Sequence, residues 1–222
     1  MRWVKKQQAL KQILKEIVTR GILPRHCYLA GGTAVNFYMN HRISIDLDFF
    51  SPYPFAGELI MHELRQTFGT IEMELLEQHS IIIYLTHEKI KFSLFYLPYP
   101  LLEDVLIFDL EGQVKCPLAS LTDLEAMKAI AIVQRGTAKD FVDLYHLLIK
   151  TGHSFSELLK NVIKKYSLEK RYEYHLKTSL IYFDDADNGI ENILLLKKQS
   201  IAQPISKNKW QTIKRFFIKY SI

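Results

Sequence analysis

The feature that most constrains this 222-residue chain is a pair of glycines within Tyr28-Leu-Ala-Gly-Gly-Thr-Ala-Val35. His26 to Ala30 has the pattern of a short buried strand, and the residues after the glycines have the pattern of a helix. Because glycine has no Cβ, the backbone N–H groups of such a turn can approach an anion closely. We therefore expect Gly31, Gly32 and Thr33 to form a phosphate-binding turn, although an ordinary tight turn has the same sequence.

A second feature follows about fifteen residues later in the chain, where polar and apolar residues alternate from Ser44 to Phe50. On a strand, this alternation sends Asp46 and Asp48 to the same face. Neighbouring carboxylates repel each other unless a cation lies between them, and hard oxygen ligands suit Mg²⁺ or Mn²⁺. A half-buried strand with one wet face shows the same alternation. The combination of phosphate turn and carboxylate pair is what predicts nucleotidyl transfer from an NTP.

Composition limits the class of protein. A hydrophobic content of 48% indicates a globular protein, and 29 basic against 24 acidic residues permit a polyanionic partner such as RNA or a nucleotide. Cys27 and Cys116 are too few for a disulfide scaffold and have no metal-ligand spacing, so we expect reduced core thiols. No apolar run is long enough to span a bilayer, which predicts a cytoplasmic protein without a membrane partner.

The order of the elements predicts an α/β (α+β) fold. Helical patterns cover 3–20 and 56–68, and β-rich segments cover 70–76, 80–86, 89–96 and 106–110. From Ser120 to its end the chain is helical apart from loops at 151–154, 184–189 and 203–206. We expect a mixed sheet covered by helices. The predicted domains are a core of residues 1–117 and a helical C-terminal part of residues 118–222.

The helical part begins with a second group of charged residues. The helix that starts at Ser120 carries Lys128 and Arg135, which are seven residues apart and so point the same way. The next helix has Asp140 and Asp143 in its first turns. A solvated lysine would account for Lys128, and favourable placement near a helix N-terminus would account for both aspartates. The residues alone leave these interpretations open.

These blocks together resemble the nucleotidyltransferase-like toxins of the AbiEii/AbiGii type, which belong to abortive-infection and toxin–antitoxin systems of phage defence. The resemblance covers most of residues 26–185. Its marks are Leu29-Ala-Gly-Gly-Thr-Ala34, His41-Arg-Ile-Ser-Ile-Asp-Leu-Asp-Phe49, Ser120-Leu-Thr-Asp-Leu-Glu-Ala-Met-Lys128, Arg135-Gly136 and Lys139-Asp-Phe-Val-Asp-Leu144. It implies a DNA-polymerase-β-like nucleotidyltransferase domain followed by helices. The implied activity is nucleotide transfer from an NTP, in some members onto the 3′ end of tRNA, and a cognate antitoxin is an implied partner.

The resemblance also implies roles for individual residues. It makes Gly31, Gly32 and Thr33 the triphosphate-binding turn. It makes Asp46 and Asp48 the catalytic metal ligands. It makes Lys128 the catalytic cation on the triphosphate and Asp140 a polar residue that completes the cleft. Arg42 and Arg135 are further cations that could bind phosphate, because guanidinium groups form charge-assisted hydrogen bonds with phosphate oxygens.

One position departs from the pattern of this superfamily. A third carboxylate normally stands on an adjacent strand, and the expected strand, Lys89 to Phe95, has Ser93 instead. A neutral hydroxyl is a poor Mg²⁺ ligand and a poor base near pH 7. Glu72 and Glu74 on the preceding strand are possible substitutes. We expect a Mg²⁺-dependent transferase acting on an RNA 3′ end or a protein hydroxyl, with a non-catalytic nucleotide- or partner-binding relative as the alternative.

The C-terminal half is rich in aromatic residues interspersed with Lys and Arg, among them Tyr174, Tyr182, Phe183, Trp210 and Phe217. Such a mixture could form a nucleic-acid platform, on which bases stack beside phosphate-binding cations. It could equally form the core of a helical subdomain, which is the interpretation we favour. A pure RNA-binding module would explain the basic charge but not the paired aspartates.

Overall fold

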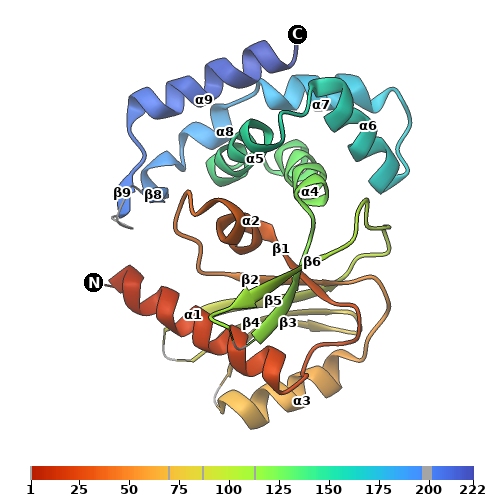
Figure 1. The fold of residues 1–222 in the computed structure, drawn as a ribbon, viewed down its shortest axis with the longest axis vertical. Helices are drawn as coiled ribbons and strands as arrows, with labels where there is room; N and C mark the ends of the chain where they lie inside the picture. The colour runs from red at the N-terminus through yellow and green to blue at the C-terminus, as the bar shows by residue number, and fades with distance from the viewer. Residues whose placement is uncertain (1, 70, 87, 113, 197–201) are drawn as a thin grey trace. The chain divides into compact units, whose positions relative to one another are not determined.

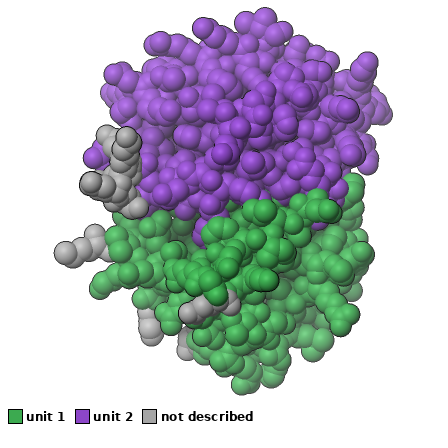
Figure 2. Space-filling model, viewed as in Figure 1, with its two compact units in different colours: residues 1–34, 44–100, 104–119 green, residues 35–43, 101–103, 120–222 purple. Residues whose placement is uncertain are grey.

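The computed structural model describes all residues except 1, 70, 87, 113 and 197–201 (Figure 1). The chain divides into two compact units, which are residues 1–34, 44–100 and 104–119, and residues 35–43, 101–103 and 120–222 (Figure 2). A single cut near residue 117 therefore misses two short segments that group with the helical part. Hydrogen bonds hold them there, from the Ile43 N–H to the Leu194 carbonyl over 2.8 Å and from the Leu102 N–H to Asp123 Oδ1 over 3.1 Å.

The first unit is built on a seven-stranded sheet in the order β3-β4-β5-β2-β1-β7-β6. The strands are β1 (Tyr28–Ala30), β2 (Leu47–Ser51), β3 (Ile71–Glu77), β4 (Ser80–Leu85), β5 (Ile90–Tyr96), β6 (Leu106–Leu110) and β7 (Val114–Leu118). β1 runs parallel to β7 and β2 runs parallel to β5, whereas the other neighbours are antiparallel. The predicted mixed sheet is confirmed. The expected strand residue Thr70 and the turn residue His87 lie outside the described residues.

Two helices, α1 (Arg2–Thr19) and α3 (Gly57–Phe68), pack on this sheet (Figure 1). The apolar stripe of α1 is buried through Leu10, Ile13, Leu14 and Ile17, as its helical spacing predicts. α1 contacts β7 and β5, and α3 contacts β3 and β4. The central strands are thereby buried, which gives the residues on β2 and β5 a rigid support.

The second unit is mainly helical. It contains most of α2 (Gly31–Met39), together with α4 (Leu121–Gln134), α5 (Ala138–Thr151), α6 (Phe155–Tyr166), α7 (Tyr172–Leu180), α8 (Asp184–Asp187), the short 3₁₀ turn η1 (Ile190–Asn192) and α9 (Lys207–Tyr220). The predicted C-terminal pattern of helices with loops is wrong at β8 (Leu194–Leu196) and β9 (Ala202–Pro204), which form a small antiparallel sheet, and at the predicted loop 184–189, which begins with the short helix α8. Arg42 forms an isolated β-bridge with Leu195, so this small sheet also holds the segment that carries Arg42.

The aromatic residues of the second unit fall into two groups. Phe183, Trp210 and Phe217 are buried in one apolar cluster with Phe141, so the core interpretation is confirmed for them. Tyr174 and Tyr182 are different, because 72% and 52% of their surfaces are exposed. Packing in the core therefore explains the buried aromatic residues of the second unit, but it does not explain Tyr174 and Tyr182.

Both cysteines are buried free thiols, as predicted. Burial raises the pKa of Cys27 to about 11 and that of Cys116 to about 12, so neither is a reactive thiolate near pH 7. Among the helices of the described residues, none combines the length and the apolar character that crossing a membrane would require.

Candidate active site

The glycine turn lies directly against one of the two predicted metal ligands. Helix α2 begins at Gly31, earlier than the predicted start at Thr33, and Gly31 has a φ of +64°. A Cβ atom built on Gly31 would overlap Oδ2 of Asp48. Glycine is therefore required here for two reasons, the left-handed backbone and the close approach of a carboxylate. The turn and Asp48 form one local structure.

Thr33 connects the turn to the other predicted ligand. Its side chain is buried, and its hydroxyl donates to the backbone carbonyl of Asp46 and lies 3.0 Å from Ser44 Oγ. The strand predicted to start at Ser44 begins only at Leu47, because the Asp46 carbonyl is bonded to Thr33. Asp46 therefore lies just before β2, and only Asp48 lies in the strand. Thr33 holds the Asp46 backbone beside the turn.

Ser93 occupies the position next to Asp48, on the adjacent strand. β2 and β5 pair in parallel with Asp48 opposite Ser93, and Ser93 Oγ donates to Asp48 Oδ1 over 2.6 Å. Ser93 is 1% exposed, so this hydrogen bond is shielded from water. The serine thus orients the carboxylate that it neighbours.

The two alternative carboxylates do not reach this position. Glu72 and Glu74 lie on β3, at the edge of the sheet, and β4 and β5 separate them from β2. Glu72 pairs with Lys89 over 2.8 Å and Glu74 with Lys91 over 3.8 Å, all on exposed side chains or nearly so. The hypothesis that these glutamates replace the third carboxylate is therefore wrong.

The donor set around the turn fits Mg²⁺. Asp46 and Asp48 are partly exposed, the absent Cβ of Gly31 lets Asp48 Oδ2 lie close against the start of α2, and Ser93 orients Asp48 by a hydrogen bond. Mg²⁺ is commonly held by one or two carboxylates together with water and substrate phosphates. No group of three or more His, Cys, Asp or Glu side chains suited to a metal is found among the described residues. Two carboxylates and phosphate oxygens are the ligands such a site would use.

The second unit contains a buried network of ion pairs centred on Asp143. Arg42 donates from Nε to Oδ1 over 2.6 Å and from Nη2 to Oδ2 over 2.7 Å, and His41 Nε2 lies 2.7 Å from Oδ1. Lys128 Nζ is 2.8 Å from Oδ2. Burial would raise the pKa of Asp143, but the charges of Arg42 and Lys128 hold it well below its usual value. Asp143 is therefore ionised.

Asp140 extends this network. Its Oδ1 accepts from both Lys128 Nζ and Arg135 Nη2 over 3.0 Å, and its Oδ2 accepts from Arg135 Nε over 2.9 Å and from Thr137 Oγ1 over 2.7 Å. Burial would raise the pKa of Asp140, but Lys128 and Arg135 lower it to about 2. Burial would likewise lower the pKa of Lys128, but Asp143 and Asp140 raise it. Asp140, Asp143 and Lys128 are therefore charged near neutral pH, as Arg42 and Arg135 always are.

The network carries a net positive charge, since Arg42, Lys128 and Arg135 face Asp140 and Asp143. Lys128 is 6% exposed, which excludes the solvated-lysine interpretation, and an ammonium group with two acceptors retains a third N–H donor. Arg135 is accessible, with 62% of its side chain exposed. The network therefore places three cationic side chains around two buried carboxylates.

The structure brings together some of the residues that the sequence singles out and adds partners that the sequence does not indicate. Lys128 and Arg135, whose spacing predicts that they point the same way, both contact Asp140. Asp143 contacts Arg42 and His41, which the sequence pattern does not indicate. Arg42 was expected to bind phosphate, but its guanidinium donates to Asp143 and to the Ile43 carbonyl. The spacing of Asp140 and Asp143, three residues apart on one helix, was the signal that both point the same way.

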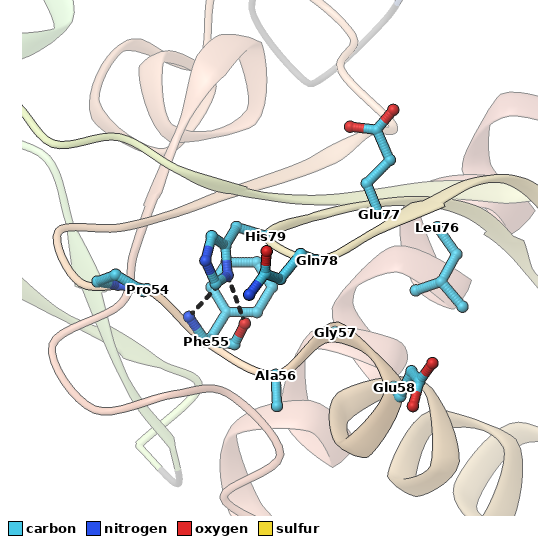
Figure 3. A pocket seen from close by; sticks show the side chains of 9 residues that line it. All are labelled: Pro54, Phe55, Ala56, Gly57, Glu58, Leu76, Glu77, Gln78 and His79. Carbon is cyan, nitrogen blue, oxygen red and sulfur yellow. Dashed lines mark hydrogen bonds between the residues drawn. The ribbon is translucent and has the colours of Figure 1, made fainter.

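The first unit also has a separate hollow of about 590 Å³, formed by residues 54–58 and the β3–β4 turn at 76–79 (Figure 3). None of the predicted site residues lines it. Figure 3 shows His79 turned toward the backbone of Phe55, whose carbonyl lies 2.7 Å from Nδ1. That imidazole therefore fastens the loop at Phe55 to the β3–β4 turn.

Comparison with known proteins identifies a family whose sequence model matches this chain. The sequence model of the family described as nucleotidyl transferase AbiEii toxin, type IV TA system, matches residues 12–220. An uncharacterized protein from Aquifex aeolicus (strain VF5) is 38% identical over 189 residues, which cover 84% of this chain and 86% of that protein.

Solved structures show the same fold at low sequence identity. MenT4, a nucleotidyltransferase toxin from Mycobacterium tuberculosis H37Rv, superposes with a TM-score of 0.56 at 11% identity, covering 97% of this chain and 84% of that one. JHP933 from Helicobacter pylori superposes with a TM-score of 0.57 at 15% identity, covering 99% and 93%. These likenesses concern the fold alone.

Proposed function

The chain belongs to the AbiEii family of nucleotidyl transferase toxins, and from this premise we propose that it moves a nucleotidyl group from an NTP onto an RNA 3′ end or a protein hydroxyl in a Mg²⁺-dependent reaction. The family comes from type IV toxin–antitoxin systems, so the chain is a toxin nucleotidyltransferase. The NTP, the metal and the acceptor are the proposed parts of this function.

The observation that carries the proposal is the packing of the Gly31 turn against Asp48. A phosphate bound to backbone N–H groups at the start of α2 would lie beside this carboxylate, which only a bridging cation makes favourable. Thr33 supports the arrangement by holding the Asp46 backbone, and Ser93 supports it by orienting Asp48. The residues proposed to bind Mg²⁺ are Asp46 and Asp48.

In the proposed reaction the acceptor hydroxyl attacks the α-phosphorus of the NTP. A new oxygen–phosphorus bond forms, the bond to the β-phosphate oxygen breaks, pyrophosphate leaves, and the hydroxyl proton passes to water. Bound Mg²⁺ would supply activation of the hydroxyl and neutralisation of the leaving pyrophosphate. Gly31, Gly32 and Thr33 would orient the triphosphate. Holding the reacting groups in position in this way would supply most of the rate enhancement.

The cations of the second unit are proposed to bind phosphate groups of the substrates. Lys128 and Arg135 fit this role, because both are held in place by the buried carboxylate of Asp140 and the network has a net positive charge. For Arg42 we propose a supporting role, since Asp143 already takes two of its N–H groups. An antitoxin protein is the proposed regulator, and the cytoplasm, where NTPs and tRNA occur, is the proposed location.

The test is incubation of the pure protein with each α-labelled NTP, with Mg²⁺ or Mn²⁺, and with total bacterial RNA and protein. The Asp46→Ala/Asp48→Ala variant should transfer no label. The matched control is Glu72→Gln, which removes an exposed carboxylate at the far edge of the same sheet and should leave transfer unchanged. The labelled product then identifies the NTP and the acceptor class.

Ser93 motivates the contrary outcome. If the wild-type protein binds NTP but no condition produces labelled RNA or protein, the lack of a third carboxylate marks a non-catalytic relative, and the proposed transfer is wrong. Equal transfer by the wild type and the double-alanine variant would also overturn the assignment of Asp46 and Asp48.

A further inference from the structure

The second unit contains a pocket beside Arg135, whose other lining residues have no role in the function proposed above. It measures about 340 Å³ and lies between the C-terminal end of α4 and the residues that connect α7 to α8. Its polar and aromatic lining consists of Gln134, Arg135, Thr178, Ser179, Tyr182 and Asp185. The pocket thus combines a cation, an anion, an aromatic ring and hydroxyl groups within one small space.

The cation of this pocket is held rigidly. Arg135 donates from Nε and Nη2 to the buried carboxylate of Asp140, yet 62% of its side chain is exposed. The same Asp140 oxygen that accepts from Arg135 Nη2 accepts from Lys128 Nζ, so the pocket borders the positive network described above. A guanidinium fixed in this way loses little freedom when it binds a phosphate group.

The aromatic ring is one of the two tyrosines that the core does not account for. Tyr182 is 52% exposed and Tyr174 is 72% exposed, whereas Phe183, Trp210 and Phe217 are buried. Tyr174 and Thr178 are four residues apart on α7, and Tyr182 follows four residues later in a turn closed by its N–H bond to Ser179. Exposed aromatic rings beside a cation are typical of surfaces on which nucleobases stack.

The carboxylates beside Tyr182 influence which kind of anion the pocket can bind. The carboxylates of Asp185 and Asp184 raise the pKa of the Tyr182 hydroxyl, as expected for negative charges near the ring. A negative charge at Asp185 disfavours a bare polyphosphate. It favours a ligand that has both a phosphate and hydrogen-bond donors, and a nucleotide has both in its phosphate and in its base amino or ribose hydroxyl groups.

We propose that this pocket binds one nucleotide, with its base stacked on Tyr182, its phosphate on Arg135 and its donor groups on Asp185 and Ser179. This proposal adds a substrate-binding pocket to the transfer reaction proposed above. It rests on that reaction, because the reaction supplies the nucleotide that the pocket would bind. The source of this nucleotide is either the NTP or the RNA acceptor. A surface tyrosine then becomes a substrate-binding residue.

Binding is tested on the full chain without divalent metal, so that no turnover occurs. The probes are the four nucleoside 5′-monophosphates and a labelled single-stranded RNA trinucleotide, followed by equilibrium dialysis and fluorescence anisotropy. Tyr182→Ala should weaken binding by about tenfold or more, whereas Tyr182→Phe should retain it because the ring is kept. The matched control is Tyr53→Ala, which removes a tyrosine of similar exposure, 60%, in the first unit and should change nothing.

The two sources separate in the transfer assay. A raised KM for NTP in Tyr182→Ala with an unchanged KM for RNA assigns the pocket to the NTP, and the reverse assigns it to the acceptor. Equal affinity of the wild type and Tyr182→Ala for every probe overturns the proposal. So does binding that Tyr182→Phe loses as fully as Tyr182→Ala, since stacking would then not be responsible.

Failure of the pocket and failure of the transfer reaction give different results. Label transfer that requires Asp46 and Asp48 but ignores Tyr182→Ala rejects the pocket alone. Nucleotide binding that depends on Tyr182, in a protein that transfers no label, supports the pocket and rejects the reaction.

Discussion

Both carboxylate oxygens of Asp143 accept hydrogen bonds from the guanidinium of Arg42, over 2.6 Å from Nε and 2.7 Å from Nη2. The two residues are 101 positions apart in the sequence, and both are buried. A bidentate pair in this setting fixes position as well as charge. It joins the short segment that carries Arg42 to helix α5 within the same unit.

Replacing Asp143 by alanine should strongly destabilise the protein. The change leaves Arg42 without its buried counter-charge and Lys128 with Asp140 alone, and breaking a buried ion pair from one side costs about 3–5 kcal/mol. Urea unfolding followed by circular dichroism measures the loss. Glu169→Ala serves as the control, because its pair with Arg171 is exposed. A comparable loss in both variants would contradict the assignment of a structural ion-pair centre.

Gly31→Ala should reduce both stability and nucleotide transfer. The new Cβ must displace Asp48, and the left-handed backbone adds strain of about 1–2 kcal/mol. Gly21→Ala is the matched control, since Gly21 has the same φ of +64° but nothing within 4 Å of a Cβ. We expect Gly21→Ala to show the backbone strain alone, with transfer retained. If the two variants lose transfer equally, the contact with Asp48 has no functional role.

Ser93→Ala should increase the Mg²⁺ concentration required for half-maximal transfer. The serine hydroxyl orients Asp48, and loss of such a supporting hydrogen bond typically weakens metal binding by about tenfold or more. Transfer assays across a Mg²⁺ titration measure the effect, with Ser80→Ala on β4 as a control for a serine elsewhere in the sheet. An unchanged Mg²⁺ requirement would show that Ser93 does not act on the metal site.

His146 should make stability depend on pH in the acidic range. Burial lowers the pKa of His146 to about 4 from its ordinary 6.5, so between these values the unfolded chain binds more protons than the folded one. The free energy of unfolding is therefore highest above pH 6.5 and falls as the pH drops toward 4, by up to about 3 kcal/mol. His146→Gln should flatten this part of the profile in urea titrations. A variant with the wild-type slope would assign the dependence to other groups.

Local patterns predicted much of the fold. Helical spacing located α1 and α3, and alternation with turn residues located β3, β4 and β5, because periodicity reflects which side of one element faces a core. The same reasoning failed at Ser44 to Asp46. There a side chain determines the backbone conformation, because the Thr33 hydroxyl donates to the Asp46 carbonyl that a neighbouring strand would otherwise bind.

The sequence by itself determined most of the elements, the mixed sheet and the family, but not the short strands β7, β8 and β9, since spacing and residue type along the chain carry the former information. Only the tertiary structure decided how individual residues are used. It turned Arg42 toward Asp143, buried Lys128 against two carboxylates, set Ser93 beside Asp48 and left Tyr182 at the surface. Each of these outcomes depends on which distant residue completes a hydrogen bond or excludes water, and that partner is selected by packing rather than by position in the chain.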